Sequence, residues 1–382
     1  MSIYSMEGDV NESAITASIW GDNSTNHLTS TTVPSSGNDF STTLSIVIPT
    51  LFALVITLGL IGNVFVIIVV LVKTHMRSPT NLLLLSLAVA DLSFLLICVP
   101  FTAYKYVNTR WIFGDIFCKI YNYMTFVCAW ASVYTLVLLC IDRLFAVVLA
   151  TKCPGVRTRK NVTIGVILVW LVTAVANIPS ILAYGKYSYV FNNETLHTCG
   201  YLPTVTYERK YILQLIFFIF GFSLPVLVIT ILYGTLVIFI RMRKAPKGNN
   251  NRRLSKAKTR VTLTVVIVVS MFVVCWLPLQ IIMLLDSFKL YRYTQNSVKV
   301  IIAANCLAYM NSCMNPILYT MTSSMFREAF KDLLCCKCKH GENNSKPLVG
   351  SKKAVPNGVE KKVDTEEEVI VDSRPLIEMR DG

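Results

Sequence analysis

Charged side chains are scarce in this chain. Aspartate, glutamate, lysine and arginine together make up 15% of its 382 residues, whereas apolar residues make up 54%. Because soluble globular domains carry about 25% charged residues, this scarcity argues against an ordinary soluble protein.

The chain also lacks the motifs of common enzymes. It contains no glycine-rich phosphate loop, no metal-ligand cluster and no nucleophile with a neighbouring base. Only one acid, Asp91, clearly lies in the middle of an apolar run, whereas an intramembrane hydrolase would need paired carboxylates or a Ser/His set. We therefore predict that the protein is not an enzyme.

Lysine and arginine are missing from the first 44 residues, which are rich in Ser, Thr, Asn and Gly. No charged stretch followed by a short apolar run opens the chain, so no cleavable signal peptide is predicted. The end of the chain mixes Lys, Glu, Ser and Pro without a period. Too few apolar side chains can be buried in either segment to offset the entropy of ordering it, so residues 1–44 and 337–382 are predicted to be disordered.

Long apolar runs, in contrast, are abundant. A helix crosses the hydrocarbon layer, about 30 Å thick, with roughly 20 apolar residues, and seven runs reach that length. Lipid offers the backbone no hydrogen-bond partners, so each run must be helical. The predicted fold is an all-α membrane protein, a seven-transmembrane helix bundle over 45–322 with a short amphipathic eighth helix over 323–336. The predicted spans are 45–72, 81–103, 116–149, 162–184, 211–240, 260–286 and 298–322.

Lysine and arginine gather in the loops that follow the first, third and fifth runs. Loops of this kind stay in the cytoplasm, so we predict a multi-pass protein of the plasma membrane with an extracellular N-terminus and a cytoplasmic C-terminus. The net charge of +14 is then a mark of topology, and no nucleic-acid partner is predicted.

The predicted topology sorts the sequons and the cysteines. Cys118 and Cys199 are the only two of the 12 cysteines predicted to face the oxidising side, which favours one disulfide between them. Asn-X-Ser/Thr sequons on the same side predict glycosylation at Asn11, Asn23 and Asn193.

The cytoplasmic segments carry candidate modification sites. Cysteines just beyond an amphipathic stretch predict palmitoylation, whereas a metal site is disfavoured because His340 is the only other suitable ligand nearby. The basic loop 241–260 suits anionic lipid headgroups, and its RRLS motif predicts phosphorylation of Ser255. The palmitoylation candidates are Cys335, Cys336 and Cys338.

Polar groups inside the apolar runs are costly and therefore informative. Spacing at i, i+4 and i+8 places Asn311, Asn315 and Tyr319 on one helix face. Together with polar residues of other runs they could satisfy Asp91 directly, through water or through a small cation, or they could serve helix packing alone. The group is Asn63, Ser132, Asn311, Ser312 and Asn315.

Asp142 and Arg143 stand side by side near the end of the third run. They follow Cys118 by about 24 residues, or about 36 Å of helix, which places them at the cytoplasmic mouth. Either they form a snorkelling interfacial pair, or Arg143 is released toward a partner in another conformation. Prolines that permit kinks in such a switch are Pro100, Pro179, Pro225, Pro278 and Pro316.

Short motifs recur in every predicted span. They are GN at 62–63, LAVAD at 87–91, Cys118, DR at 142–143, Trp170, Pro225, FVVCWLP at 272–278 and NPILY at 315–319. Each motif alone is weak, but the ordered set, with at least one in each span, is specific. In this order the motifs resemble those of the rhodopsin-like G-protein-coupled receptors from about residue 45 to residue 336.

The resemblance implies a receptor that activates a heterotrimeric G protein, with arrestin and receptor kinases as further partners. It implies that Phe272 and Trp276, beside Pro278, form a switch under the ligand pocket, and that the polar group around Asp91 is the family's sodium pocket. The remaining residues implied to act in coupling are Asp142, Arg143, Tyr233, Asn315, Pro316 and Tyr319.

Two positions depart from the family pattern. Leu144 follows the Asp-Arg pair, where the family usually has Tyr or Phe, and Lys258 stands where many members carry an acid that pairs with the Arg. The lock between the third and sixth spans is therefore expected to be weak and basal signalling raised. Unstimulated signalling no higher than in mock-transfected cells would contradict this expectation.

Residues that other branches of the family require are missing here, which narrows the resemblance to one group of receptors. Thr125 stands where amine, opioid and somatostatin receptors have Asp, and Tyr309 stands where opsins have the retinal Lys. The stretches 99–106, 111–119, 131–137 and 308–319 are most similar to the galanin and allatostatin-A (buccalin) receptors, which bind neuropeptides, often amidated. Kisspeptin-type receptors are the nearest alternative within the family.

A peptide pocket is expected in the upper bundle. Inhibitory G proteins are favoured over calcium coupling by analogy with galanin receptors. A rival from another class is an ion-coupled transporter that uses Asp91, which predicts substrate flux instead of nucleotide exchange on a G protein. The candidate peptide-binding residues are Phe101, Tyr104, Thr125, Phe126, His197, Gln280, Met283, Asp286, Asn305 and Tyr309.

Overall fold

The computed structural model describes most of the chain between residues 37 and 334. The described ranges are 37–108, 110–149, 155–191, 193–242, 249–292, 294–322 and 324–334. The candidate sites Asn11, Asn23, Cys335, Cys336 and Cys338 lie outside these ranges, and the side chains of Ser255 and Lys258 are not described.

Seven helices within the described ranges are long and apolar enough to cross a membrane. This confirms the predicted seven-helix bundle, with boundaries shifted by a few residues. The spans are Ile46–Val72, Pro79–Val107, Gly114–Val147, Arg159–Ala183, Tyr207–Phe239, Val266–Ser287 and Asn296–Met321.

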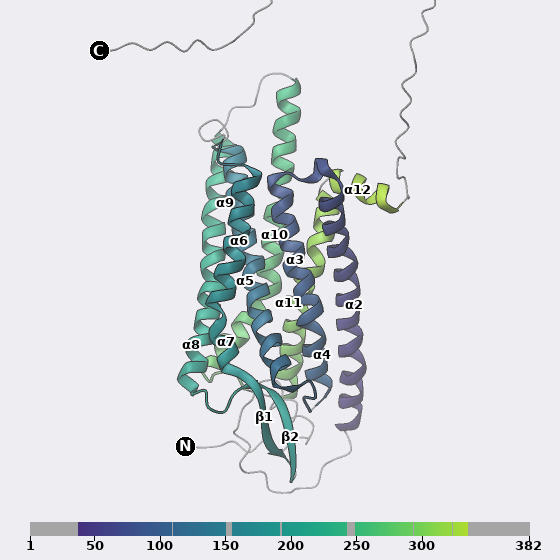
Figure 1. Cartoon of the computed structure of the whole chain (residues 1–382), viewed down its shortest axis with the longest axis vertical. Helices are drawn as coiled ribbons and strands as arrows, with labels where there is room; N and C mark the ends of the chain where they lie inside the picture. Colours follow the sequence, from purple (N-terminus) through teal and green to yellow (C-terminus); the bar gives the residue numbers. More distant parts are fainter. Residues whose placement is uncertain are drawn as a thin grey trace, which may run out of the picture. The chain divides into compact units, whose positions relative to one another are not determined.

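The helices run side by side, with a β-hairpin at one end of the bundle and a short helix at the other (Figure 1). We call these the hairpin end and the α12 end. The helices that make up the seven spans are α2 (Gly37–Val72), α3 (Pro79–Ile97), α4 (Val99–Val107), α5 (Gly114–Val147), α6 (Arg159–Ala176), α7 (Ile178–Ala183), α8 (Tyr207–Phe218), α9 (Leu224–Met242), α10 (Asn249–Ser287) and α11 (Gln295–Thr322).

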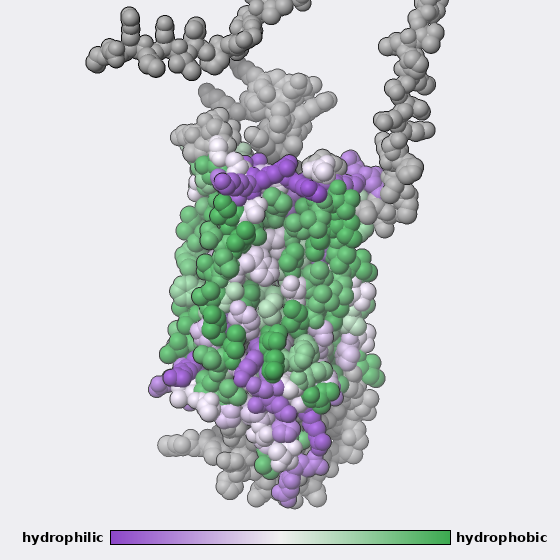
Figure 2. Space-filling model, viewed as in Figure 1, coloured by the Kyte–Doolittle hydropathy of each residue, from purple (hydrophilic) through white to green (hydrophobic). Residues whose placement is uncertain are grey.

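Apolar side chains cover the middle of the face seen in Figure 2, and hydrophilic side chains gather at its two ends. Leu58, Leu168 and Leu171 are each more than half exposed. In water such a surface would drive aggregation, but a hydrocarbon layer solvates it. The outward-facing leucines therefore agree with the membrane spans.

Two of the five prolines divide their spans. The second span breaks at Cys98, with Pro100 in the first turn of α4, and the fourth breaks at Asn177, with Pro179 in the first turn of α7. Proline has no N–H, so it is accommodated where a helix begins. Pro278 and Pro316, in contrast, lie inside the continuous helices α10 and α11.

The fifth span contains a π-helical segment, Ile219–Ser223, between α8 and α9. Gly221 lies over the Trp130 indole there, and a Cβ added at Gly221 would fall 2.6 Å from Trp130 Nε1. The Tyr134 hydroxyl donates to the carbonyl of Phe220 at 2.9 Å. Because π-bulges interrupt the regular backbone ladder, this carbonyl is available to α5.

Strands β1 (Tyr184–Phe191) and β2 (Glu194–Tyr201) form the antiparallel hairpin. The predicted disulfide is confirmed: Cys118 of α5 and Cys199 of β2 are bonded, with 5.6 Å between their Cα atoms. The bond fixes the hairpin to the first turns of α5. Asn193 turns the hairpin with a φ of 60°, a conformation that asparagine adopts more readily than most residues.

Helix α12 (Ser324–Leu334) follows α11 and supplies the predicted eighth helix. Phe326 and Ala329 on one of its faces are buried. The Phe330 ring stacks on Phe65 of α2 at 3.8 Å, and Asp332 pairs with Lys73 at 2.7 Å. These contacts hold α12 against the end of α2.

Candidate functional site

A pocket opens at the hairpin end between α4, α5, α8, α10 and α11, with about 960 Å³ of empty space that includes its solvent-open part. Its lining residues are Phe94, Thr102, Lys105, Tyr106, Tyr121, Asn122, Thr125, Phe126, Tyr184, Gly200, Tyr201, Gln214, Phe217, Trp276, Leu279, Met283, Asn305 and Tyr309.

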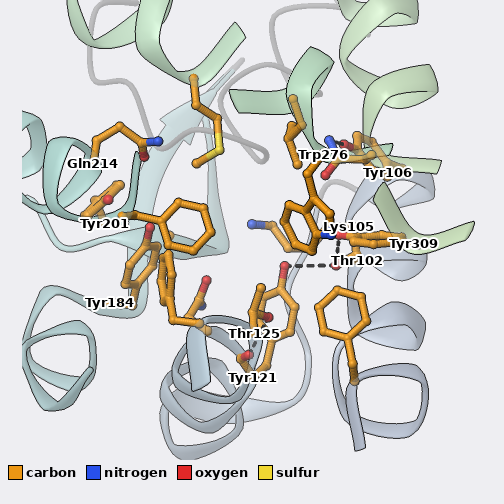
Figure 3. A pocket seen from close by; sticks show the side chains of 18 residues that line it. Thr102, Lys105, Tyr106, Tyr121, Thr125, Tyr184, Tyr201, Gln214, Trp276 and Tyr309 are labelled. Atoms are coloured by element: carbon orange, nitrogen blue, oxygen red, sulfur yellow. Dashed lines mark hydrogen bonds between the residues drawn. The ribbon is translucent and has the colours of Figure 1, made fainter. Parts of the chain in front are cut away.

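Lys105 is the only charged residue among the described residues that line this pocket. Its side chain reaches into the cavity (Figure 3), and its Nζ lies 5.9 Å from the centre of the Tyr121 ring. This separation suits a cation–π contact. The pocket therefore presents one positive charge and no carboxylate, a balance that favours hydrogen-bond acceptors or anions on a ligand.

The pocket floor is held by a hydrogen-bonded row of hydroxyl groups. Tyr309 donates to Thr102 at 3.1 Å, and Thr102 and Tyr121 are joined at 3.1 Å (Figure 3). The amide of Asn305 donates to the Tyr106 hydroxyl at 2.7 Å. Because each of these side chains is fixed by another, the floor is pre-formed, which lowers the entropy cost of binding.

Two buried donors in the pocket have no partner among the described residues: the Gln214 amide nitrogen and the Trp276 indole nitrogen. Gln214 lies across the cavity from Trp276 (Figure 3). An unpaired buried donor costs about 1–3 kcal/mol, and most buried polar groups in proteins are paired. A ligand that brings acceptors to these nitrogens would recover that free energy.

The hairpin closes one side of the pocket with two tyrosines. The rings of Tyr184 and Tyr201 lie 4.2 Å apart between centroids. Burial raises the pKa of Tyr201 to about 12 and raises that of Tyr184 as well. Both hydroxyls therefore stay protonated at physiological pH and offer hydrogen bonds without charge.

The structure divides the ten candidate peptide-binding residues. Five line the pocket: Thr125, Phe126, Met283, Asn305 and Tyr309.

The other five lie elsewhere. Phe101 and Tyr104 pack edge to face on Phe113, at 4.9 and 4.8 Å between ring centroids. His197 lies in β2, where its Nδ1 is 2.8 Å from the Ser188 hydroxyl, and Gln280 is 1% exposed. Asp286 lies near the end of α10 and does not line the pocket.

Several lining residues were missed from the sequence because they come from places without a motif. The hairpin contributes Tyr184, Gly200 and Tyr201, and α8 contributes Gln214 and Phe217. The one usable signal was Cys199: its bond to Cys118 draws its neighbours Gly200 and Tyr201 over the bundle.

Three members of the predicted polar group, Ser132, Ser312 and Asn315, lie next to Asp91 in the core. Asn315 donates to the Asp91 carboxylate at 2.7 Å, and Ser132 and Ser312 lie close enough to interact with it. Asn63 donates to the backbone carbonyl of Ser312 at 2.9 Å. All of these residues, and Asn311, are buried.

The donor set around Asp91 fits a small hard cation. It consists of a carboxylate, two hydroxyls and amide oxygens, which are the ligands that hard cations prefer. The Asn63 amide oxygen is buried without a partner among the described residues. A buried carboxylate without a countercharge is costly, so a monovalent cation would offset its charge.

Asp142 and Arg143 lie at the α12 end and are both buried. Arg143 donates to Asp142 through Nε at 3.1 Å and also contacts Thr80 of α3. Arg157, in the segment before α6, donates to the other Asp142 oxygen at 2.6 Å. Arg143 is thus held by its neighbours in α5 and α3, and the pair is not an exposed interfacial one.

A row of aromatic side chains leads from the pocket into the bundle. Trp276 lines the pocket, and its ring centroid lies 6.0 Å from that of Phe272, which lies 6.2 Å from that of Phe222. Tyr233 and Tyr319 are further along α9 and α11. The Tyr319 hydroxyl is buried without a partner among the described residues, and the Tyr233 hydroxyl meets only the weakly bonding thiol of Cys140, so both could gain hydrogen bonds in another arrangement.

Comparisons with known proteins agree with this arrangement. A family model described as "7 transmembrane receptor (rhodopsin family)" matches residues 62–319. The chain is 40% identical over 293 residues to the Allatostatin-A receptor of Bombyx mori, which covers 77% of this chain and 81% of that protein.

Two other relatives are similar over a comparable share of the chain. The Galanin-like G-protein coupled receptor npr-9 of Caenorhabditis elegans is 34% identical over 320 residues, which covers 76% of this chain and 74% of that protein. The Galanin receptor type 2 of Homo sapiens is 32% identical over 291 residues, with coverages of 76% and 73%. By its seven spans, its motifs and these matches, the chain belongs to the rhodopsin family of seven-transmembrane receptors.

Proposed function

We propose that this chain binds a neuropeptide of the allatostatin-A or galanin type and transmits the signal to a heterotrimeric G protein. Membership of the family makes the chain a receptor and not an enzyme, which sets the transporter alternative aside. The names of the relatives support the ligand class. The observation that carries the proposal is the pocket, with aromatic walls, one cation and two donors that lack partners among the described residues.

The chemistry of the pocket favours a peptide end that is apolar and rich in acceptors. An amidated C-terminus has this character, because its carbonyl oxygens accept hydrogen bonds and it carries no charge that must be desolvated. The carbonyls would meet the Gln214 and Trp276 nitrogens, and apolar side chains would pack on Phe126 and Phe217.

The proposal requires the hairpin end to face the outside of the cell. The basic loops support this orientation by the positive-inside bias. The G protein would then bind at the α12 end, where release of Arg143 from Asp142 and Thr80 would expose a cation to it. Inhibitory G proteins are favoured, and arrestin and receptor kinases would use the same end.

The first test is a G-protein activation assay in transfected cells, read as cyclic AMP and calcium together. An amidated peptide ending in Phe-Gly-Leu-amide is expected to lower cyclic AMP at nanomolar concentration, and its free-acid form to be weaker. Galanin and kisspeptin serve as comparison ligands. A stronger response to the free acid would refute the proposal of an amidated ligand and would indicate that Lys105 pairs with the C-terminal carboxylate of the peptide.

A matched pair of glutamine variants tests the pocket itself. Gln214→Leu removes an unpartnered donor from the pocket wall, so peptide potency is expected to fall about 10-fold or more, as loss of one buried hydrogen bond implies. Gln280→Leu replaces a glutamine that is also buried but lies outside the pocket, and is expected to keep potency within about 3-fold. Equal effects of the two variants would argue against this pocket.

Loss of signalling in Arg143→Ala, at unchanged peptide binding, would support the proposed coupling end. If a well-expressed receptor responded to none of the peptides, the family assignment would still hold, but the choice of ligand class would be refuted.

A further inference from the structure

A second groove lies on the outside of the bundle, between α3, α5, α6 and the segment before α6. It holds about 480 Å³ of empty space, partly open to the surroundings. Its walls are mostly apolar and include Leu83, Leu138, Phe145, Val162 and Gly165. All five belong to helices long and apolar enough to cross a membrane, so acyl chains can reach the groove.

One end of the groove is polar. Asp142 and Arg157 line it there, next to Asn161. The Asp142 side chain is 3% exposed, whereas that of Arg157 is 33% exposed. The accessible charge at this end of the groove is therefore positive.

The charges behind the groove do not cancel. Asp142 faces two guanidinium groups, those of Arg143 and Arg157. Two positive charges against one negative charge leave an excess of one positive charge at the membrane boundary. Arg159 and Lys160 add exposed basic residues in the first turn of α6. An occupant with a negative headgroup would balance this excess.

Arg157 also has N–H groups that take no part in its hydrogen bonds to Asp142 and Thr80. Its hydrogen bonds to Asp142 and Thr80 use Nε and Nη2. Within the described part of the chain no hydrogen bond of Arg157 uses Nη1. The guanidinium group carries five N–H donors, so those on Nη1 remain for a further acceptor while Asp142 stays paired.

The segment that carries Arg157 is fixed to α6. The Thr158 hydroxyl caps the helix by accepting from the Asn161 backbone N–H at 3.1 Å, and the Asn161 amide donates to the Val156 carbonyl at 2.8 Å. Arg157 is therefore held at the mouth of the groove, which pre-organises it for a ligand.

We propose that this groove binds an anionic phospholipid of the surrounding membrane. One acyl chain lies against Leu83, Leu138, Phe145 and Val162, and the phosphate of the headgroup accepts hydrogen bonds from Nη1 of Arg157. Because lipid tails are as apolar as the groove walls, the acyl chain gains only packing contacts there, and the charge-assisted hydrogen bond supplies the selectivity for an anion. Because Arg157 stays on Asp142, the lipid ties the segment before α6 to α3 and α5.

The test uses the full-length chain in nanodiscs of phosphatidylcholine with a small fraction of phosphatidylserine that carries a photoreactive group in one acyl chain. After irradiation, the labelled residues are mapped by mass spectrometry. We expect labels on the groove walls in α5 and α6, and at least 5-fold less labelling there from a phosphatidylcholine probe of the same design. Equal labelling by both probes would refute the anionic selectivity.

Two variants of Gly165 separate a loss of acyl-chain binding from a general effect on folding. A Cβ at Gly165 would lie 3.6 Å from Leu138, an ordinary contact, so Gly165→Ala leaves the groove open and should keep the labelling. Gly165→Leu fills the groove and is expected to reduce labelling at least 5-fold. Undiminished labelling in Gly165→Leu would overturn the proposal.

Arginine variants test the headgroup. Arg157→Gln is expected to remove the preference for phosphatidylserine, whereas Arg159→Gln, which does not line the groove, is expected to keep it. Excess soluble glycerophosphoserine, a headgroup without acyl chains, tests whether the groove recognises the whole lipid or only its phosphate. If the groove binds the lipid, glycerophosphoserine should not displace the labelled probe. Displacement would show that the headgroup alone binds. A preference for phosphatidylserine that survives Arg157→Gln would also refute the assignment.

Discussion

Asp91 is 1% exposed and receives a hydrogen bond from Asn315 of α11. A single carboxylate in such a position joins α3 to α11 and, through the nearby Ser132, to α5. We propose that a sodium ion shares this carboxylate with the oxygens of Ser132, Asn311, Ser312 and Asn315. A cation there would favour the arrangement in which these three helices stay close.

Sodium is therefore expected to weaken agonist binding, because ligands that favour different arrangements oppose each other reciprocally. Replacing choline chloride with sodium chloride at constant ionic strength should lower peptide affinity of the wild type about 5-fold or more, the lower range of such couplings. Asp91→Asn should remove this difference in competition binding.

The control for this experiment is Asp115→Asn. Asp115 is an acid at the start of α5 that pairs with Lys119, away from the Asp91 group. It should leave the sodium effect unchanged. An equal sodium effect in wild type and Asp91→Asn would place the cation elsewhere or nowhere.

At the scale of elements, the π-helical segment in the fifth span shows how two helices fit together. Gly221 allows Ile219–Ser223 to pass over Trp130 without a clash. The same segment leaves the Phe220 carbonyl free for Tyr134. The fit between α5 and the fifth span thus depends on the absence of one side chain.

Gly221→Val is expected to lower the stability of the detergent-purified receptor, because overpacking of this kind costs about 1–3 kcal/mol. The measurement is the apparent melting temperature followed by thiol-reactive dye or ligand retention. Gly234→Ala in α9 is the matched control: nothing lies within 4 Å of its added Cβ, so stability should be unchanged or slightly raised. Equal melting temperatures of the wild type and Gly221→Val would contradict the tight fit.

At the scale of the whole molecule, the sites that carry glycans report which end of the bundle faces the outside of the cell. Asn193 lies exposed at the turn of the hairpin, within a sequon. Asn161 lies in the first turn of α6, also within a sequon but on the side predicted to be cytoplasmic.

Asn193→Gln is expected to remove one glycan and shift the receptor on a gel, because the glycosylation machinery works only on the lumenal side. Asn161→Gln should produce no shift. Treatment with a glycosidase should remove the difference between wild type and Asn193→Gln. A glycan on Asn161 would reverse the proposed orientation.

The sequence predicted the membrane fold well because the hydrocarbon layer imposes length and polarity on each span, and these can be read residue by residue. The disulfide between Cys118 and Cys199 followed from topology alone. The breaks at Cys98 and Asn177 were signalled by Pro100 and Pro179, but the intact helices at Pro278 and Pro316 show that proline permits a break without requiring one.

The pocket was only half predictable. Phe101 and Tyr104 were chosen for their aromatic character, yet they pack against Phe113, whereas Gln214 and Tyr201 came into the pocket without any motif. Which way a side chain points depends on the rotation of each helix about its axis. In a lipid-facing bundle both sides of a helix are apolar, so hydropathy carries little information on that rotation.

The sequence by itself determined the seven spans, the disulfide and the family. It did so because these depend on composition, spacing and ordered motifs along the chain. Only the tertiary structure decided which side chains face the pocket, that Arg157 joins Arg143 on Asp142, and that a charged groove opens beside Gly165. These features depend on contacts between residues far apart in the chain, which are set when the helices pack.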